Sequence, residues 1–215
     1  GDDGFRAVLN GDFVDKSYVI DAINKTLNTD RQFSCVSRAR RFGKSIVAKM
    51  LYAYYDKWCK DAELFNGLEV SKYSSFSKHL HRYPVLYIDM TDFITRYRTD
   101  DIVERIEEDV ISELREIYSD LSIKDNENLS GVLYSIVSQL SQEKFIVIID
   151  EWDAILREWP EGSRAAVDYL NLLRGLFKSS TAMSIFAGVY MTGILPIKKY
   201  KTQSALNNFH EYSVV

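Results

Sequence analysis

Four short, nearly continuous apolar runs divide the chain and predict the strands of a buried sheet. They cover residues 33–36, 84–90, 145–150 and 183–192. Within each run the apolar side chains mostly follow one another rather than alternate with polar ones, which is typical of parallel strands covered on both faces. The pattern therefore predicts a mainly parallel sheet between two helical layers.

Between these runs, apolar residues recur every three to four positions, as they do on the buried face of a helix. The predicted helices cover residues 46–58, 102–117, 129–140 and 167–177, with another around 18–27. Strands that alternate with helices are typical of a doubly wound α/β sheet. The last twenty residues show no regular pattern, and we expect the chain to be part of a longer one.

Residues 37–45 have the sequence SRARRFGKS and join the first predicted strand to the first long helix. Backbone N–H groups at a helix N-terminus bind anions, and the helix dipole favours negative charge there. Gly43 would let the backbone approach a phosphate, Lys44 could reach the β- and γ-phosphates of a nucleotide, and the Ser45 hydroxyl could bind Mg²⁺. The other residues that we expect at this ligand are Arg40, Arg41 and Phe42.

One position departs from the usual phosphate-loop pattern, which has a glycine five residues before Gly43. Arg38 stands there, but three arginines in the loop offset the loss, because guanidinium groups bind phosphate strongly. The alternative interpretation is a basic helix start on a solvated loop. It is disfavoured because cations are stabilised at helix C-termini rather than N-termini, so four cations at this helix start indicate an anion.

The apolar run 145–150 provides a second signal, since it ends in the carboxylates of Asp150 and Glu151. Ligands of open α/β sheets bind at the carboxyl ends of the strands. We therefore expect Asp150 to hold Mg²⁺ and Glu151 to be the general base that orients water for attack on the γ-phosphate. Asp89 ends another strand at the same edge, and Asp153 is expected as an exposed carboxylate in a first helical turn. A solvated acidic turn is the alternative, but its combination with Gly-Lys-Ser favours a nucleotide site.

The last apolar run ends at Thr192. In phosphate-loop ATPases a polar residue at the end of the strand beside the acidic one can orient the attacking water, and Thr192 fits that place. Lys198 and Lys199 follow it and could reach phosphate or nucleic acid. A plain basic loop is the interpretation that we favour for these two lysines.

Several sequence blocks together resemble the bacterial AAA-ATPase-like proteins. SRARRFGKS at 37–45 is similar to the family's R-P-R-R-F-G-K-[ST] loop, which also lacks the first glycine, although Ala39 replaces the usual proline. FVDKS at 13–17 and IIDEWD at 148–153 resemble the upstream and acidic motifs of the family. YMTGILPIKKY at 190–200 and SALNNF at 204–209 resemble its closing signature. The blocks occur in the family's order and cover nearly the whole chain.

The resemblance implies a P-loop NTPase fold, a three-layer α/β sandwich with a mainly parallel central sheet, that binds ATP with Mg²⁺. It also implies the roles given above for Lys44, Ser45, Asp150 and Glu151. We accordingly expect an N-terminal segment over 1–32 packed on the NTPase core, the core over 33–200, and the start of a C-terminal extension over 201–215. Family members often carry a restriction-type nuclease domain, but its Asp/Glu-x-Lys motif does not occur in these 215 residues.

Composition limits the alternatives. Hydrophobic residues make up 46% of the chain, which is ordinary for a globular domain, and no apolar run approaches the ~20 residues of a membrane span. The net charge of −4 disfavours a nucleic-acid-binding module built on the loop arginines, Lys198 and Lys199.

A non-hydrolysing nucleotide-binding scaffold or sensor remains the other alternative, which the altered loop suggests and Glu151 opposes. Our prediction is an ATP-hydrolysing switch or motor.

Some expectations concern partners and surroundings. Cys35 and Cys59 are too few for a disulfide framework, so we expect a reduced, cytoplasmic compartment with both thiols in the core. His79 and His81 are expected at the surface rather than on a metal. A homo-oligomer or a downstream domain could complete the site, and Arg96 and Arg98 could act as arginine fingers there or be ordinary exposed arginines.

Overall fold

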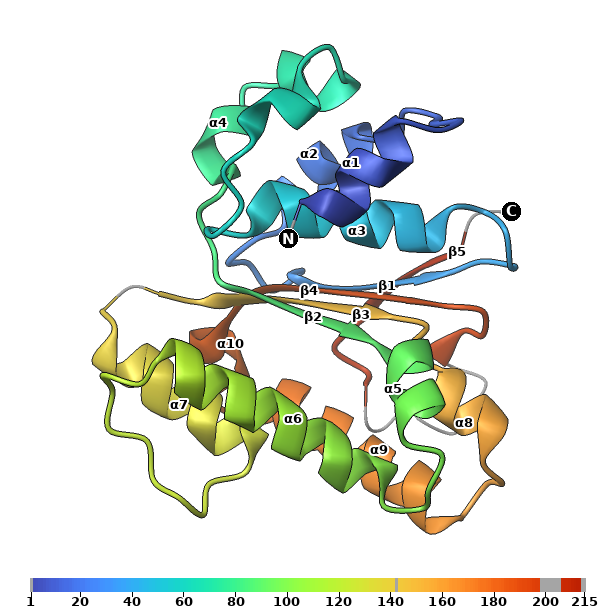
Figure 1. The fold of residues 1–215 in the computed structure, drawn as a ribbon, viewed down its shortest axis with the longest axis vertical. Helices are drawn as coiled ribbons and strands as arrows, with labels where there is room; N and C mark the ends of the chain where they lie inside the picture. The colour runs from blue at the N-terminus through green and yellow to red at the C-terminus, as the bar shows by residue number, and fades with distance from the viewer. Residues whose placement is uncertain (1, 142, 198–205, 214–215) are drawn as a thin grey trace.

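The computed structural model describes residues 2–141, 143–197 and 206–213 as one sheet between two helical layers (Figure 1). The sheet has the strand order β2-β3-β4-β1-β5, and every pairing in it is parallel. Its strands are β1 (Phe33–Ser37), β2 (Val85–Asp89), β3 (Phe145–Asp150), β4 (Phe186–Gly193) and β5 (His210–Ser213). The predicted α/β class and the parallel sheet are confirmed.

The helices fall into two groups, one on each face of the sheet (Figure 1). One face carries α1 (Asp3–Leu9), α2 (Tyr18–Asn24), α3 (Lys44–Tyr55) and α4 (Phe76–His79), with the 3₁₀ turns η1 (Ala62–Phe65) and η2 (Glu69–Lys72). The other carries α5 (Met90–Arg96), α6 (Ile102–Ile117), α7 (Leu129–Gln139), α8 (Ala154–Glu158), α9 (Arg164–Phe177) and α10 (Ala182–Ile185). In the described part of the chain, no helix is both long and apolar enough to cross a membrane.

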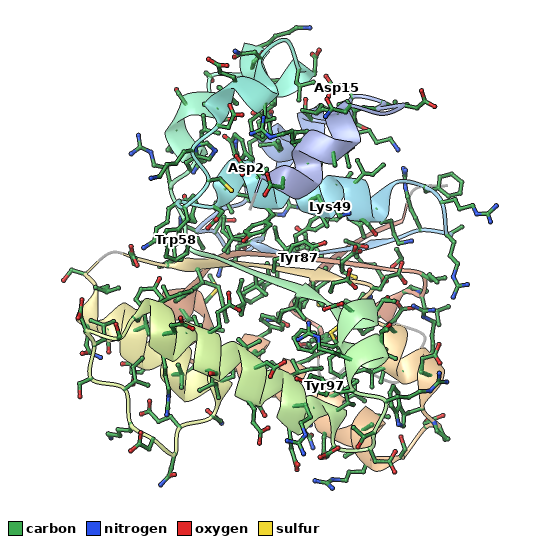
Figure 2. All side chains as sticks on the ribbon, viewed as in Figure 1. Asp2, Asp15, Lys49, Trp58, Tyr87 and Tyr97 are labelled. Atoms are coloured by element: carbon green, nitrogen blue, oxygen red, sulfur yellow. The ribbon has the colours of Figure 1, made fainter. Side chains whose placement is uncertain are left out.

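β3 shows why the apolar runs become strands. All six of its residues are buried, and successive side chains enter opposite cores. Phe145 and Val147 pack with α6, α7 and α9, whereas Ile146 and Ile148 pack with α3. Side chains fill the layers on both sides of the sheet, with Asp15 among the helices of one face and Tyr97 on the other (Figure 2). This explains why the first five residues of this central strand are all apolar.

Several local expectations are wrong at their boundaries. α3 ends at Tyr55, because Asp56 turns to an extended backbone and pairs with Tyr83, so Trp58 lies beyond the helix. Residues 183–185 belong to α10 rather than to the last strand. The chain end is not irregular throughout, since His210–Ser213 form β5 beside β1. This strand lies at the sheet edge and needs no apolar run, which explains why the pattern missed it.

His79 is buried rather than exposed, and its Nδ1 lies 2.8 Å from the Tyr83 hydroxyl. Burial lowers the pKa of His79, which favours the neutral ring. His81 Nε2 lies 3.1 Å from the carbonyl oxygen of Ala53. Both cysteines are buried, as expected.

Candidate functional site

The phosphate loop (residues 38–43) connects the carboxyl end of β1 to the first turn of α3. Arg41 and Gly43 both have left-handed backbones, with φ of 69° and 77°. Glycine adopts this conformation without strain, which explains why Gly43 directly precedes the helix. The loop therefore turns sharply enough to present Lys44 as the first residue of α3, with a side chain only 5% exposed.

Besides the helical bond from the Val47 amide to the carbonyl oxygen of Gly43, three hydrogen bonds tie the loop to its surroundings. The Arg38 amide donates to the carbonyl oxygen of Gly193 at 3.0 Å, which links the loop to the end of β4. The Lys16 ammonium donates to the carbonyl oxygen of Phe42 at 3.2 Å. Lys44 Nζ donates to the carbonyl oxygen of Ala39, also at 3.2 Å. All three bonds end on backbone carbonyls, so they set the path of the loop without fixing its side chains.

The side chains predicted at the ligand are mostly open to solvent. Arg40, Arg41 and Ser45 are exposed, and Phe42 is 56% exposed. Like charges that face solvent at a helix N-terminus have no structural reason to gather there. The arrangement is therefore suited to an anionic ligand.

Asp150 ends β3 and is buried. Its Oδ1 accepts hydrogen bonds from Thr192 Oγ1 at 3.0 Å and from the Glu151 amide at 3.1 Å. Thr192 lies on β4, which pairs with β3 on one side and with β1 on the other. The structure thus places Thr192 between the acidic strand and the strand that leads into the phosphate loop.

Glu151 follows with a left-handed backbone, φ 55°, so the chain turns as soon as β3 ends. Its Oε1 lies 3.4 Å from Lys44 Nζ, and its Oε2 accepts a hydrogen bond from Arg157 Nη2 at 2.7 Å. A non-glycine residue in this conformation is strained, and such strain concentrates at functional sites. The two strongest sequence signals, Lys44 and Glu151, are therefore in contact.

Asp153 is not the exposed carboxylate that we expected. It is fully buried, and it accepts hydrogen bonds from the amides of Ile194 and Leu195 at 3.3 and 3.0 Å. It also forms an ion pair with Arg157 Nε at 3.1 Å. The sequence reasoning overlooked Arg157, although Asp and Arg four residues apart on a short helix are a recognisable pair.

Lys16 and its neighbours were noted only as part of a resemblance, and the structure shows what they contact. Asp15 accepts hydrogen bonds from the amides of Ser17 and Glu69, and Ser17 Oγ accepts one from Val70. The motif at 13–17 therefore joins the phosphate loop, through Lys16, to the helical layer above it.

A cavity of about 780 Å³ opens between the phosphate loop, α5 and α8. Lys44, Ser45, Asp150 and Glu151 line it, together with Asp89 at the end of β2. Asp89 and Asp150 are register partners, and burial together with the nearby Asp150 raises the pKa of Asp89. We call this space the charged cavity.

One carboxylate oxygen of Asp150 remains available to bind Mg²⁺. Both hydrogen bonds received by the Asp150 side chain end on Oδ1, which leaves Oδ2 for a ligand. Across the described residues, no three His, Cys, Asp or Glu side chains form a ready-made metal site. Mg²⁺ is usually held by one or two carboxylates together with substrate phosphates rather than by a protein cage.

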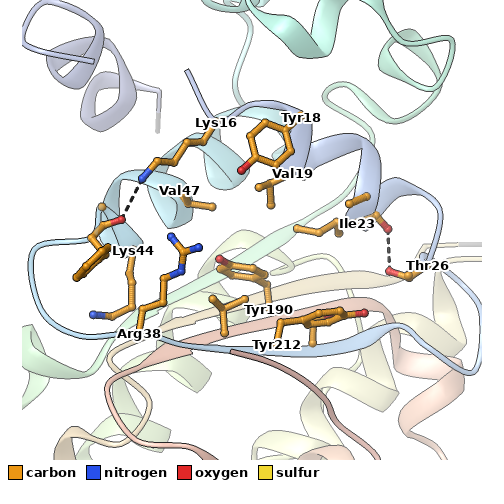
Figure 3. Close-up of a pocket in the computed structure, with 15 residues that line it drawn as sticks. Lys16, Tyr18, Val19, Ile23, Thr26, Arg38, Lys44, Val47, Tyr190 and Tyr212 are labelled. Carbon is orange, nitrogen blue, oxygen red and sulfur yellow. Dashed lines mark hydrogen bonds between the residues drawn. The ribbon is translucent and has the colours of Figure 1, made fainter. Parts of the chain in front are cut away.

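A second cavity, of about 260 Å³, lies on the other side of the loop (Figure 3). Its walls are mainly apolar and include Val36 on β1, Tyr190 on β4 and Tyr212 on β5. Figure 3 shows Lys16, Arg38 and Lys44 at one end of this space and Ile23 and Thr26 toward the other. Gly43 and Lys44 line both cavities, so the loop separates an apolar space from a charged one.

The remaining predicted residues differ in where they lie. Arg96 pairs with Asp92 and with Asp109. Arg98 lines the charged cavity and lies 3.8 Å from Glu158. Lys198 and Lys199 fall outside the described residues.

These features define the class of the molecule. It is an α/β protein whose all-parallel sheet is consistent with a P-loop-like sandwich, with a basic loop and an acidic strand end at one edge. A family model described as AAA-ATPase-like, "Predicted AAA-ATPase", matches residues 5–202. The chain belongs to this family, which confirms the resemblance noted in the sequence and supports a general ATPase-like role. Comparison with curated proteins gives no match.

Proposed function

We propose that this protein binds ATP with Mg²⁺ and hydrolyses it, with the β- and γ-phosphates and the metal in the charged cavity. The observation that carries the proposal is the contact between Lys44 and Glu151, in a cavity that Ser45 and Asp150 also line. A lysine at a helix N-terminus can bind phosphate, and a carboxylate at a strand end can bind a metal ion or activate water.

On the phosphate side, Lys44 and the loop amides bind the β- and γ-phosphates. Arg40 and Arg41 add positive charge from the exposed side of the loop, and Phe42 shields it. Ser45 and Asp150 hold Mg²⁺, which when bound neutralises charge on the phosphate oxygens.

On the acidic side, Glu151 accepts a proton from the attacking water as general base. Thr192 keeps Asp150 in place through its hydroxyl and lies where it can help to orient that water. The contact of Glu151 with Lys44 supports this assignment, because it places the carboxylate next to the group that holds the γ-phosphate.

The apolar cavity beyond the loop receives the nucleoside. Its tyrosines offer flat apolar surfaces of the kind on which bases stack. Lys16, which lies at the loop end of this cavity, would be near the ribose or the α-phosphate. In a larger protein, the core over 33–200 would work as a switch or motor.

A non-hydrolysing scaffold is the second candidate, and one observation favours it. Both oxygens of Glu151 already contact cations, Lys44 and Arg157, so this carboxylate has a structural role whether or not it activates water.

The test is phosphate release with and without Mg²⁺, for wild type and Glu151→Gln, with exposed Glu116→Gln as the matched control. We expect wild-type turnover to need Mg²⁺ and to fall at least ~100-fold in Glu151→Gln, since general bases contribute 10²–10⁴-fold. ATP affinity, measured by titration, should persist in the variant. ATP binding without wild-type turnover would favour the scaffold, and absence of binding would overturn both candidates.

A further inference from the structure

We infer that Arg157 is a positioning residue for Glu151, a role that rests on the proposed function. Arg157 would hold the carboxylate in place while Lys44 contacts phosphate. The inference comes from the unequal way in which the two oxygens of Glu151 are bound.

Lys44 and Arg157 contact different oxygens of Glu151. The Lys44 contact with Oε1 is 3.4 Å long, and the same ammonium also donates to the carbonyl of Ala39. The Arg157 contact with Oε2 is 2.7 Å long, within the range of a strong charge-assisted hydrogen bond. When Lys44 turns toward a phosphate, the shorter bond remains and Glu151 keeps its orientation.

Arg157 itself has little freedom to move. Its Nε pairs with Asp153, whose own carboxylate is fixed by the amides of Ile194 and Leu195. The Arg157 amide also donates to the carbonyl oxygen of Asp153 at 3.1 Å, within the turn that begins α8. The guanidinium is thus anchored to the end of β4, and only 18% of its side chain is exposed.

The charge of Arg157 is already balanced by two carboxylates, Glu151 and Asp153. A guanidinium in this setting is poorly suited to neutralise charge on a phosphate, because leaving Asp153 would strand a buried carboxylate. The arrangement therefore supports a positioning role and not direct contact with the reacting atoms.

The end of β4 and the residues that follow it hold both Asp150 and Asp153. Thr192 donates to Asp150, and two residues later the backbone donates to Asp153, which holds Arg157. The groups that would bind metal and activate water are therefore held by one short segment, residues 192–195, at and just beyond the end of β4.

The first arm of the test is steady-state hydrolysis for Arg157→Gln and Arg157→Lys, with the ATP dissociation constant measured separately. The matched control is Arg164→Gln, an exposed arginine that also pairs with two carboxylates, Glu104 and Asp168. Misplacement of a reacting group by about 1 Å can cost ~10²-fold, so we expect kcat to fall 10- to 100-fold in Arg157→Gln. The dissociation constant should change less than about threefold, because Arg157 does not touch phosphate in this scheme. Arg157→Lys should recover part of kcat, and Arg164→Gln should match wild type.

The second arm needs no nucleotide. Thermal midpoints of Arg157→Gln, Glu151→Gln and the double variant form a cycle that measures the coupling of the pair. We expect the thermal midpoint of the double variant to fall by less than the sum of the falls in the two single variants. Additive falls would contradict the contact between Arg157 and Glu151. If wild type fails to hydrolyse ATP, the proposed function fails and this role fails with it. If wild type hydrolyses ATP and Arg157→Gln has an unchanged kcat, only the role of Arg157 is overturned.

Discussion

The phosphate loop and the acidic end of β3 face one cavity, yet they are held in opposite ways. The loop exposes Arg40 and Arg41, and its path is set by hydrogen bonds to backbone carbonyls. At the acidic end, Asp150 and Asp153 are buried and every carboxylate is bonded to a neighbour. Groups that take part in chemistry benefit from being fixed beforehand, and under the proposed function this applies to the acidic end. Mutations should therefore damage the fold at the acidic end and ligand binding at the loop.

The largest expected effect is on the fold, at Asp153. Asp153→Ala leaves Arg157 without its buried partner and two amides without an acceptor, and breaking a buried pair typically costs about 3 kcal/mol or more. Denaturant unfolding measures this loss. Asp168→Ala, which removes a partly exposed partner of the exposed Arg164, should change stability by less than about 0.5 kcal/mol. Equal losses of stability in the two variants would contradict the view that the acidic end is held by its buried contacts.

The next effect is on ligand binding, at Lys44. ATP and Mg²⁺ at 100 times the dissociation constant should stabilise the wild type by about 2.7 kcal/mol. For a domain of this size that corresponds to a rise of about 5–10 °C in the thermal midpoint. Lys44→Ala should remove the shift, whereas exposed Lys49→Ala on the same helix should retain it. A full rise in the thermal midpoint of Lys44→Ala on adding ATP would show that the phosphate loop is not part of the ATP-binding site.

Gly193 allows a test of how tightly the residues at the acidic end are packed. A Cβ at this position would lie 2.6 Å from the Trp152 ring and 2.7 Å from Asp153 Oδ1. Because both neighbours are buried, Gly193→Ala should cost about 1–3 kcal/mol by overpacking. Gly175→Ala is the control, since nothing lies within 4 Å of its Cβ and a helical glycine gains about 0.5–1 kcal/mol on this change. Thermal midpoints that fail to move in opposite directions would contradict the packing of this segment.

The smallest effect on the fold is expected within the loop, at Arg41. Its left-handed backbone favours glycine, but glycine also gains freedom in the unfolded chain, so Arg41→Gly should change stability by less than about 1 kcal/mol. ATP affinity should nevertheless fall several-fold, because one cation is lost. Calorimetric titration and unfolding of the same variant would separate the two quantities. A loss of several kcal/mol would show that the loop is as rigid as the acidic end.

The sequence predicted much of the fold, because buried parallel strands and long amphipathic helices leave clear periodic patterns. Phe145–Asp150 was predicted to the residue, and the helix at Ile102–Ile117 likewise. The edge strand His210–Ser213 was missed, since an edge position does not require an apolar run. The short helices α1, α5, α8 and α10 were missed because they span too few turns to show a period.

The sequence proposed residues that the structure brings together, but it did not predict the contacts between them. Lys44, Ser45, Asp150, Glu151 and Thr192 were chosen from local motifs, and the structure brings them to one sheet edge. The burial of Asp153 depends on the amides of Ile194 and Leu195, which a linear pattern cannot reveal. The contacts of Lys16 with Phe42 and of Arg157 with Glu151 were not predicted either, because these partners lie on other elements or across a turn.

The position of β1 in the sheet also constrains the order of assembly. β1 lies between β4 and β5, with Phe33 beside Val189 and Ser34 beside His210. Contacts between such distant parts of the chain form slowly, because a long loop must close first. During synthesis the N-terminal strand that carries the phosphate loop must wait for the last strands to leave the ribosome. A growing chain would thus form its helices before the phosphate loop gains its support from β4 and β5.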